Sequence, residues 1–175
     1  MNAKRKILEK IVRVDQAGEV GAQQIYEGQK LVFKTLKNKK DYDQISRMAN
    51  EEKEHLDYFN ELAKKESIKP TKLSNLFGVG AFAMGIGTAL LGRKAAYVCT
   101  EAVEEVIEAH YQKQIDELEG IHDDVREKII KFQEDEVDHK NTAINEGSQQ
   151  TLGLSLIHIS EPTRRYAISY AVFCL

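Results

Sequence analysis

The chain has 175 residues, of which 42% are hydrophobic, and its 25 Lys and Arg against 28 Asp and Glu give a net charge of −3. This length suits one domain with a substantial core, since two domains would each be marginal. Acidic residues are spread along the chain without a basic block, which argues against a nucleic-acid partner. Cys99 and Cys174 lack CxxC spacing, so neither a disulfide framework nor a zinc or rubredoxin-type site is supported.

Four stretches carry apolar residues at helical period and predict long helices. They span residues 11–36, 42–63, 94–118 and 125–144. Breaks are predicted at residues 38–41, at 67–75 with Pro70, and at 119–122, where Gly120 suits a helix C-cap. The breaks after the first and third helices are short, so each predicts a helical hairpin, and the fold class is all-α.

Residues 76–92, between the two hairpins, are uncharged, apolar and rich in glycine. The stretch is shorter than the roughly 20 residues of a membrane span, so it is predicted to be an insertion and not a transmembrane helix. Six cations flank it: Lys64, Lys65, Lys69, Lys72, Arg93 and Lys94. This composition favours an interfacial anchor on anionic lipid. The alternative is a buried connection whose glycines allow close contact between helices.

The first domain is predicted to cover residues 1–146, and the tail at 147–175 has a different character. Residues 152–159 and 166–175 are apolar and β-prone, with Pro162 between them. We interpret this tail as the product of a frameshift, a truncated assembly or an expression scar, and scars do not belong in a fold argument.

Two E-x-x-H motifs occupy residues 52–55 and 136–139, and this spacing places a carboxylate and an imidazole on one helix face. A third match at 119–122 contains Gly120 and is interpreted as a turn. A solvated helix face is the usual explanation of a single such motif. Both helical motifs, however, share their faces with apolar residues. Because burying unpaired carboxylates is costly, a bound cation is the expected resolution.

Each predicted hairpin also has a lone glutamate on its inward face, Glu19 before Glu52 and Glu104 before Glu136. Four helices thus offer four glutamates and two histidines, the donors of di-iron and di-manganese bundles. Four carboxylates balance the charge of two Fe(II) ions, and mixed oxygen and imidazole donors favour iron over zinc or calcium, with manganese as the alternative. By spacing alone, three other glutamates remain rivals of Glu104: Glu101, Glu105 and Glu108.

With these residues identified, the chain resembles the demethoxyubiquinone hydroxylase family, di-iron monooxygenases of late ubiquinone biosynthesis. The resemblance covers about residues 11–144 and rests on residues 11–19, 51–56, 59–62, 70–71, 85–92, 102–105, 110–111 and 135–136. It implies a ferritin-like four-helix bundle with an apolar insertion between its hairpins. The ligands that it implies are Glu19, Glu52, His55, Glu104, Glu136 and His139. It also makes His110 and Tyr111 candidates for proton transfer beside the irons. Residues 154–175 depart from the family pattern.

The resemblance implies O2-dependent hydroxylation of a demethoxyubiquinol-type polyprenyl quinol, with Glu52 and Glu136 as bridging ligands of two irons. The electron donor stays open between NADH, a reductase and the quinol, since no nucleotide-binding fingerprint occurs. A polyprenyl substrate implies a peripheral position on a membrane surface, at the cytoplasmic face of a bacterial inner membrane or the matrix face of the mitochondrial inner membrane. An accessory lipid-binding partner and a homo-oligomer are further open expectations.

Two other functions use the same features. A ferritin- or rubrerythrin-like protein that oxidises or stores iron could have the same ligands, although the apolar insertion and the missing CxxC pairs argue against it. A metal-free helical scaffold with solvated glutamates is the other alternative, and it predicts that the six donor side chains do not converge.

Overall fold

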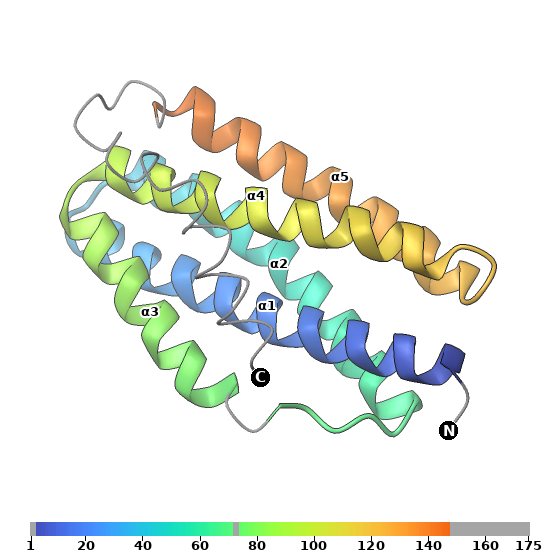
Figure 1. The fold of residues 1–175 in the computed structure, drawn as a ribbon. Helices are drawn as coiled ribbons and strands as arrows, with labels where there is room; N and C mark the ends of the chain where they lie inside the picture. The colour runs from blue at the N-terminus through green and yellow to red at the C-terminus, as the bar shows by residue number, and fades with distance from the viewer. Residues whose placement is uncertain (1–2, 72–73, 148–175) are drawn as a thin grey trace, which may run out of the picture.

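A computed structural model describes residues 3–71 and 74–147, so nearly all of the predicted tail lies outside the described residues. The described chain contains five α-helices and no strand: α1 Ala3–Thr35, α2 Lys39–Lys65, α3 Ser74–Leu90, α4 Arg93–Leu118 and α5 Asp123–Asn145. Helices α1, α2, α4 and α5 correspond to the four predicted helices and pair as the hairpins α1–α2 and α4–α5 (Figure 1). The predicted all-α bundle of two hairpins is confirmed.

The helix ends follow the predicted signals in most places. The Asn38 side chain caps α2 by accepting a hydrogen bond from the backbone N–H of Asp41 at 3.3 Å. Helix α4 ends just before Gly120, whose φ of 65° glycine adopts without strain. The third E-x-x-H match therefore lies in a turn, as predicted. Helix α1 begins earlier than the predicted residue 11, because Leu8 is also buried and extends the apolar stripe by one turn.

Two apolar clusters fill the bundle and leave a polar layer between them. On α1, Val12 belongs to one cluster and Tyr26 to the other, and buried Glu19 lies between these two positions. On α2, Met48 and Phe59 belong to different clusters in the same way, and the first E-x-x-H motif separates them. The fold therefore places the charged side chains at mid-length of the bundle, with apolar packing at both ends.

Helix α3 is the predicted insertion, and it packs on the outside of the bundle against α1 and α4 (Figure 1). Its approach to α1 requires glycine: a Cβ on Gly85 would collide with the backbone of Ile25, and a Cβ on Gly28 with that of Phe82. The opposite side of this segment presents Leu76, Val79, Leu90 and Leu91 as exposed side chains. No helix in the described ranges has the length and apolarity needed to cross a membrane.

Candidate metal centre

The polar layer contains the six side chains that the sequence singled out as ligands. Each of them is at most 1% exposed: Glu19, Glu52, His55, Glu104, Glu136 and His139. Helices α1 and α4 each contribute one glutamate, and α2 and α5 each contribute one E-x-x-H motif. None of the three rival glutamates on α4 is buried. The structure thus brings the six predicted donors together and excludes a scaffold with solvated glutamates.

The donor atoms form two groups, and within each group they all lie within 4.8 Å of one another. The first group is Glu19, Glu52, His55 and Glu136, and the second is Glu52, Glu104, Glu136 and His139. The two motif glutamates belong to both groups, whereas each lone glutamate and each histidine belongs to one. This is the arrangement needed for two metal ions that share two bridging carboxylates.

The histidines reach across from one hairpin to the other. His55 on α2 has its Nδ1 3.2 Å from Glu136 Oε1 on α5, and His139 on α5 has its Nδ1 3.0 Å from Glu52 Oε1 on α2. Both Nδ1 atoms are buried and lack a well-oriented hydrogen bond to any described residue. Each imidazole therefore directs one nitrogen at the carboxylates of the opposite hairpin.

The carboxylates likewise offer atoms that suit a bound cation. Both oxygens of Glu52 and of Glu136, and Oε2 of Glu19 and of Glu104, are buried without a hydrogen-bond partner among the described residues. Buried polar atoms are normally satisfied, and leaving this many unpaired is costly. A pair of cations would satisfy every one of them together with the two histidine nitrogens. The residues present therefore fit a binuclear metal site.

Burial is also the main cause of the unusual pKa values of these groups. It raises the pKa of Glu52 to about 7, with help from the nearby Glu136 and Glu104 charges. Burial likewise raises the pKa values of Glu19, Glu104 and Glu136. For His139, burial opposes the charged form, but the close carboxylates of Glu136 and Glu52 raise its pKa to about 12. Without metal, burial thus favours protonated carboxyl groups over unpaired negative charges in this cluster.

The outer nitrogen of each histidine is held by an acid whose role the sequence did not reveal. His55 Nε2 lies 3.1 Å from Asp135 Oδ2, and His139 Nε2 lies 2.7 Å from Glu51 Oε2. When Nε2–H donates to a carboxylate, Nδ1 keeps its lone pair and can bind a metal. The available signal was that an acid precedes the motif glutamate in both motifs, as in Asp135-Glu136.

Two tyrosines link the lone glutamates across α1 and α4. The hydroxyl of Tyr111 on α4 donates to Glu19 on α1, and the hydroxyl of Tyr26 on α1 donates to Glu104 on α4. Burial raises the pKa of both tyrosines, so both remain neutral donors. Tyr111 was a predicted site residue, whereas Tyr26 was not. Its signal was that each tyrosine follows the glutamate of its own helix by the same two helical turns.

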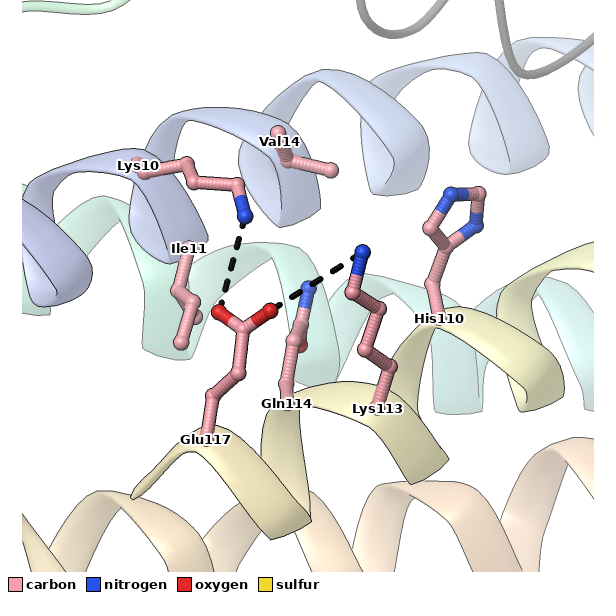
Figure 2. Close-up of a pocket in the computed structure, with 7 residues that line it drawn as sticks. All are labelled: Lys10, Ile11, Val14, His110, Lys113, Gln114 and Glu117. Carbon is pink, nitrogen blue, oxygen red and sulfur yellow. Dashed lines mark hydrogen bonds and ion pairs between the residues drawn. The ribbon is translucent and has the colours of Figure 1, made fainter.

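His110, the other candidate for proton transfer, lies towards the surface. Its Nδ1 donates to the Val106 carbonyl at 2.9 Å, and burial lowers its pKa. The imidazole lines a small surface pocket between α1 and α4, whose rim includes the Lys10–Glu117 ion pair at 3.5 Å (Figure 2). His110 thus lies between solvent and the interior and does not belong to either donor group.

An apolar cavity of about 420 Å³ lies between α1, α3 and α4 and reaches one side of the centre. Its walls include Ile25 from α1, Phe77, Ala81 and Met84 from α3, and Val103 and Ile107 from α4. Glu19, His110 and Tyr111 also line it, whereas Glu104 and Tyr26 do not. The first donor group is therefore the one that a ligand in this cavity would meet.

Comparison with known proteins gives the same family throughout. The profile described as "Ubiquinone biosynthesis protein COQ7" matches residues 6–170. A relative from Dictyostelium discoideum, named NADPH-dependent 3-demethoxyubiquinone 3-hydroxylase, mitochondrial, is 44% identical over 149 residues, which cover 83% of this chain and 67% of the relative. The Caenorhabditis elegans protein of the same name is 40% identical over 146 residues, covering 81% and 76%. The Rhodospirillum rubrum 3-demethoxyubiquinol 3-hydroxylase is 38% identical over 144 residues, covering 82% and 67%. The chain therefore belongs to the COQ7 family of ubiquinone biosynthesis proteins.

Proposed function

We propose that this chain hydroxylates the ring of a demethoxyubiquinol-type polyprenyl quinol with O2, using two iron ions bound in the polar layer. The observation that carries this proposal is the meeting of two donor groups, joined through Glu52 and Glu136, with an apolar cavity. The three relatives described above are named as hydroxylases of demethoxyubiquinone or demethoxyubiquinol, and none is named as an iron-storage protein. The storage alternative is therefore not supported.

The residues have distinct tasks in this proposal. Iron supplies the reductive activation of O2. Glu52 and Glu136 would help to hold both ions, while Glu19 and Glu104 would each hold one of them. The cavity walls hold the quinol ring beside Glu19. They also exclude water from the space where the ring would react. Tyr111 holds the Glu19 carboxylate in place through its hydrogen bond.

The reaction needs an external reductant. One oxygen atom of O2 enters the ring and the other leaves as water, so two electrons and two protons are consumed. The names of the Dictyostelium discoideum and Caenorhabditis elegans relatives specify NADPH. A reduced nicotinamide is therefore our proposed donor, in preference to the quinol itself.

A polyprenyl substrate must pass from a bilayer to the cavity, and α3 is the helix suited to this task. Its inner side walls the cavity through Phe77 and Met84, and its outer side exposes Leu76, Val79 and Leu90. We place the chain as a peripheral protein on the matrix face of a mitochondrial inner membrane or the cytoplasmic face of a bacterial one. Co-sedimentation with anionic vesicles tests this position, and the variant Val79→Glu should weaken it.

The decisive experiment is a single turnover with the purified chain. The protein is loaded anaerobically with two Fe(II) ions, which supply the two electrons of one turnover. It is then mixed with O2 in the presence of a short-chain demethoxyquinol, and the product is identified by mass spectrometry. We expect one added oxygen, labelled when ¹⁸O2 is used. Iron that is oxidised and retained while the quinol stays unchanged would instead indicate the storage function.

A matched pair of α3 variants tests whether the cavity is the substrate site. Gly80 lines the cavity and Gly87 does not, and a Cβ at either position would meet no atom within 4 Å. Gly80→Leu should therefore raise the KM for the quinol by about tenfold through lost space, since the binding of apolar groups is worth about 1–3 kcal/mol. Gly87→Leu should leave the KM unchanged. Equal KM values for the two variants would place the substrate elsewhere.

A further inference from the structure

Helices α1 and α4 repeat several polar side chains around the metal centre, but they differ one turn before the glutamates. The corresponding pairs are Glu19 and Glu104, Tyr26 and Tyr111, and Gln29 and Gln114, and all of these side chains are buried. One turn before the glutamate, however, α1 has Asp15 and α4 has Thr100, both also buried. An acid is thus present only in the half that opens on the cavity.

Asp15 has an environment unlike that of a structural ion pair. Its Oδ1 accepts a hydrogen bond from Gln114 Nε2 at 2.6 Å, while its Oδ2 is buried without a partner among the described residues. The corresponding Gln29 instead donates to the Ala96 carbonyl, at 3.1 Å. Burial raises the pKa of Asp15 to about 8, although the Gln114 hydrogen bond opposes this change. Asp15 therefore carries a proton at neutral pH, and since Oδ1 is the acceptor, the proton is on Oδ2.

The position of Asp15 connects it to the metal centre. It lies one turn before Glu19 on the same face of α1, and its partner Gln114 lies one turn after Tyr111 on α4. The Asp15–Gln114 pair is therefore the next contact between α1 and α4 after the Tyr111–Glu19 pair. Asp15 is thus held one helical turn from Glu19, the predicted ligand that accepts the hydrogen bond of the Tyr111 hydroxyl.

Asp15 is also connected to the surface. Both Asp15 and His110 line the cavity, and His110 lines the surface pocket between α1 and α4 as well (Figure 2). That pocket measures about 10 Å³, which is room for one water molecule. Since His110 Nδ1 donates to the Val106 carbonyl, Nε2 carries the lone pair that can take up a proton.

Among the described titratable groups around Asp15, none of the others is expected to release a proton near neutral pH. Glu19 on α1 is predicted to bind metal, and burial raises the pKa of Tyr111 on α4 well above neutral. Burial also raises the pKa of Tyr58 on α2, to about 12. The described residues that α3 contributes to the cavity are Phe77, Gly80, Ala81 and Met84, and none of these titrates.

We propose that Asp15 is a proton-transfer residue that holds a proton between the surface pocket at His110 and the Tyr111–Glu19 pair, and delivers it inward during hydroxylation. The inference rests on the proposed function, because that reaction consumes two protons for every two electrons taken from the reduced nicotinamide. Asp15 gives up its proton from Oδ2 and is reprotonated from solvent by way of His110 and water in the cavity. A buried acid then supplies protons to a cavity whose walls are mostly apolar.

The variant Asp15→Asn tests this role, and Thr100→Val is its matched control in the other half. Asparagine keeps the oxygen that accepts from Gln114 and removes only the acidic proton. In the iron-loaded full chain, Asp15→Asn should lower kcat by about a hundredfold. The decline of the wild-type kcat above pH about 8 should be absent in this variant. The iron content and the KM for the quinol should stay unchanged. Thr100→Val should keep the wild-type kcat and pH profile. An Asp15→Asn variant with the wild-type kcat and profile would overturn the proposal.

An infrared measurement tests the same proposal without turnover. In the iron-loaded chain, where the metal displaces protons from the ligand glutamates, the wild type and Thr100→Val should show the C=O stretching band of a protonated carboxyl group at neutral pH, shifted on transfer to D2O, and Asp15→Asn should lose it. His110→Phe should slow that shift by about tenfold by blocking entry from the surface. A band in Asp15→Asn equal to that of the wild type, or one that never exchanges, would overturn the proposal. A wild type that exchanges this proton but hydroxylates no quinol would refute the proposed reaction alone.

Discussion

The two halves of the metal centre carry matching donors in unequal surroundings. Glu19 and its partner Tyr111 line the cavity, whereas Glu104 and its partner Tyr26 are enclosed by the bundle. Helix α3 makes this difference. Its first half leaves space beside α1, while its second half packs directly on α1 at Gly28 and brings Ala89 into the apolar cluster of Tyr26. The matching residues of α1 and α4 can therefore serve two proposed metal positions. Helix α3, which has no counterpart in this repeat, decides which of the two positions would meet the substrate.

The largest effect that this comparison predicts comes from removing a donor that both halves share. Glu52→Ala takes a ligand from both donor groups, and Glu104→Ala takes one from the enclosed group only. We expect less than about one iron per chain for Glu52→Ala and about one for Glu104→Ala, measured by plasma mass spectrometry on gel-filtered protein. Hydroxylation should fall by at least about a thousandfold in Glu52→Ala. Two irons retained in Glu52→Ala would show that this glutamate is not a bridge.

The sequence predicted the polar layer because its signals are local. An E-x-x-H spacing on a helix fixes which side chains share a face, and apolar neighbours such as Met48 and Phe132 indicate that this face is buried. Short breaks, one of them with Gly120, then fix the hairpins. The helices and the meeting of the two E-x-x-H motifs follow from these facts without knowledge of tertiary contacts. Glu104, however, was separated from its three neighbouring glutamates only by the family resemblance.

The unequal surroundings could not be predicted, since they depend on contacts between distant segments. Nothing near Gly85 in the sequence indicates that its backbone lies against Ile25 of α1, which is the contact that places α3. The crossed pairing of His55 with Asp135 requires knowing that α2 and α5 are neighbours. The spacing from Glu19 to Tyr26 matches that from Glu104 to Tyr111, but only the hydrogen bond from Tyr26 to Glu104 gives this tyrosine a place at the site.

The two tyrosines sharpen the comparison, because the same change can be made in each half. Tyr111→Phe removes the hydrogen bond to Glu19 at the cavity, and we expect kcat to fall by about tenfold to a hundredfold. Tyr26→Phe removes the bond to Glu104 in the enclosed half. It should lower the free energy of unfolding by about 1–3 kcal/mol, measured by urea denaturation, with little change in kcat. Equal losses of kcat would mean that the cavity gives Tyr111 no special role.

The acids behind the histidines allow a similar test on metal affinity. Asp135→Asn alters the support of His55 at the cavity, and Glu51→Gln alters that of His139 in the enclosed half. Each variant should weaken one of two Co(II) binding steps by about tenfold to a hundredfold, measured by calorimetric titration. Glu51 is also held by Arg47, at 3.0 Å, so its side chain keeps its position better than the half-exposed Asp135. If either variant weakened both steps equally, the histidines would not belong to separate metal positions.

The smallest predicted effect concerns the pH dependence of stability without metal. Burial raises the pKa of Glu52 to about 7 and that of Asp15 to about 8, well above their values of about 4 in an unfolded chain. Between pH about 4 and 8, the folded protein therefore binds more protons than the unfolded one, and its stability falls as the pH rises. The Tm of the metal-free protein, followed by circular dichroism, should accordingly be higher at pH about 5 than at pH about 8.

Iron should reverse this trend, because protons and metal compete for the same carboxylates, so the loaded protein should lose stability as the pH falls. The two halves should differ at the alkaline end of the metal-free profile. Asp15→Asn removes the group with a pKa of about 8 and should flatten the curve between pH about 7 and 8, whereas Thr100→Val should not. A metal-free Tm that rose with pH would contradict protonated carboxyl groups in the core. If Asp15→Asn left the pH dependence of Tm unchanged, its part between pH about 7 and 8 would instead belong to the ligand glutamates that both halves share.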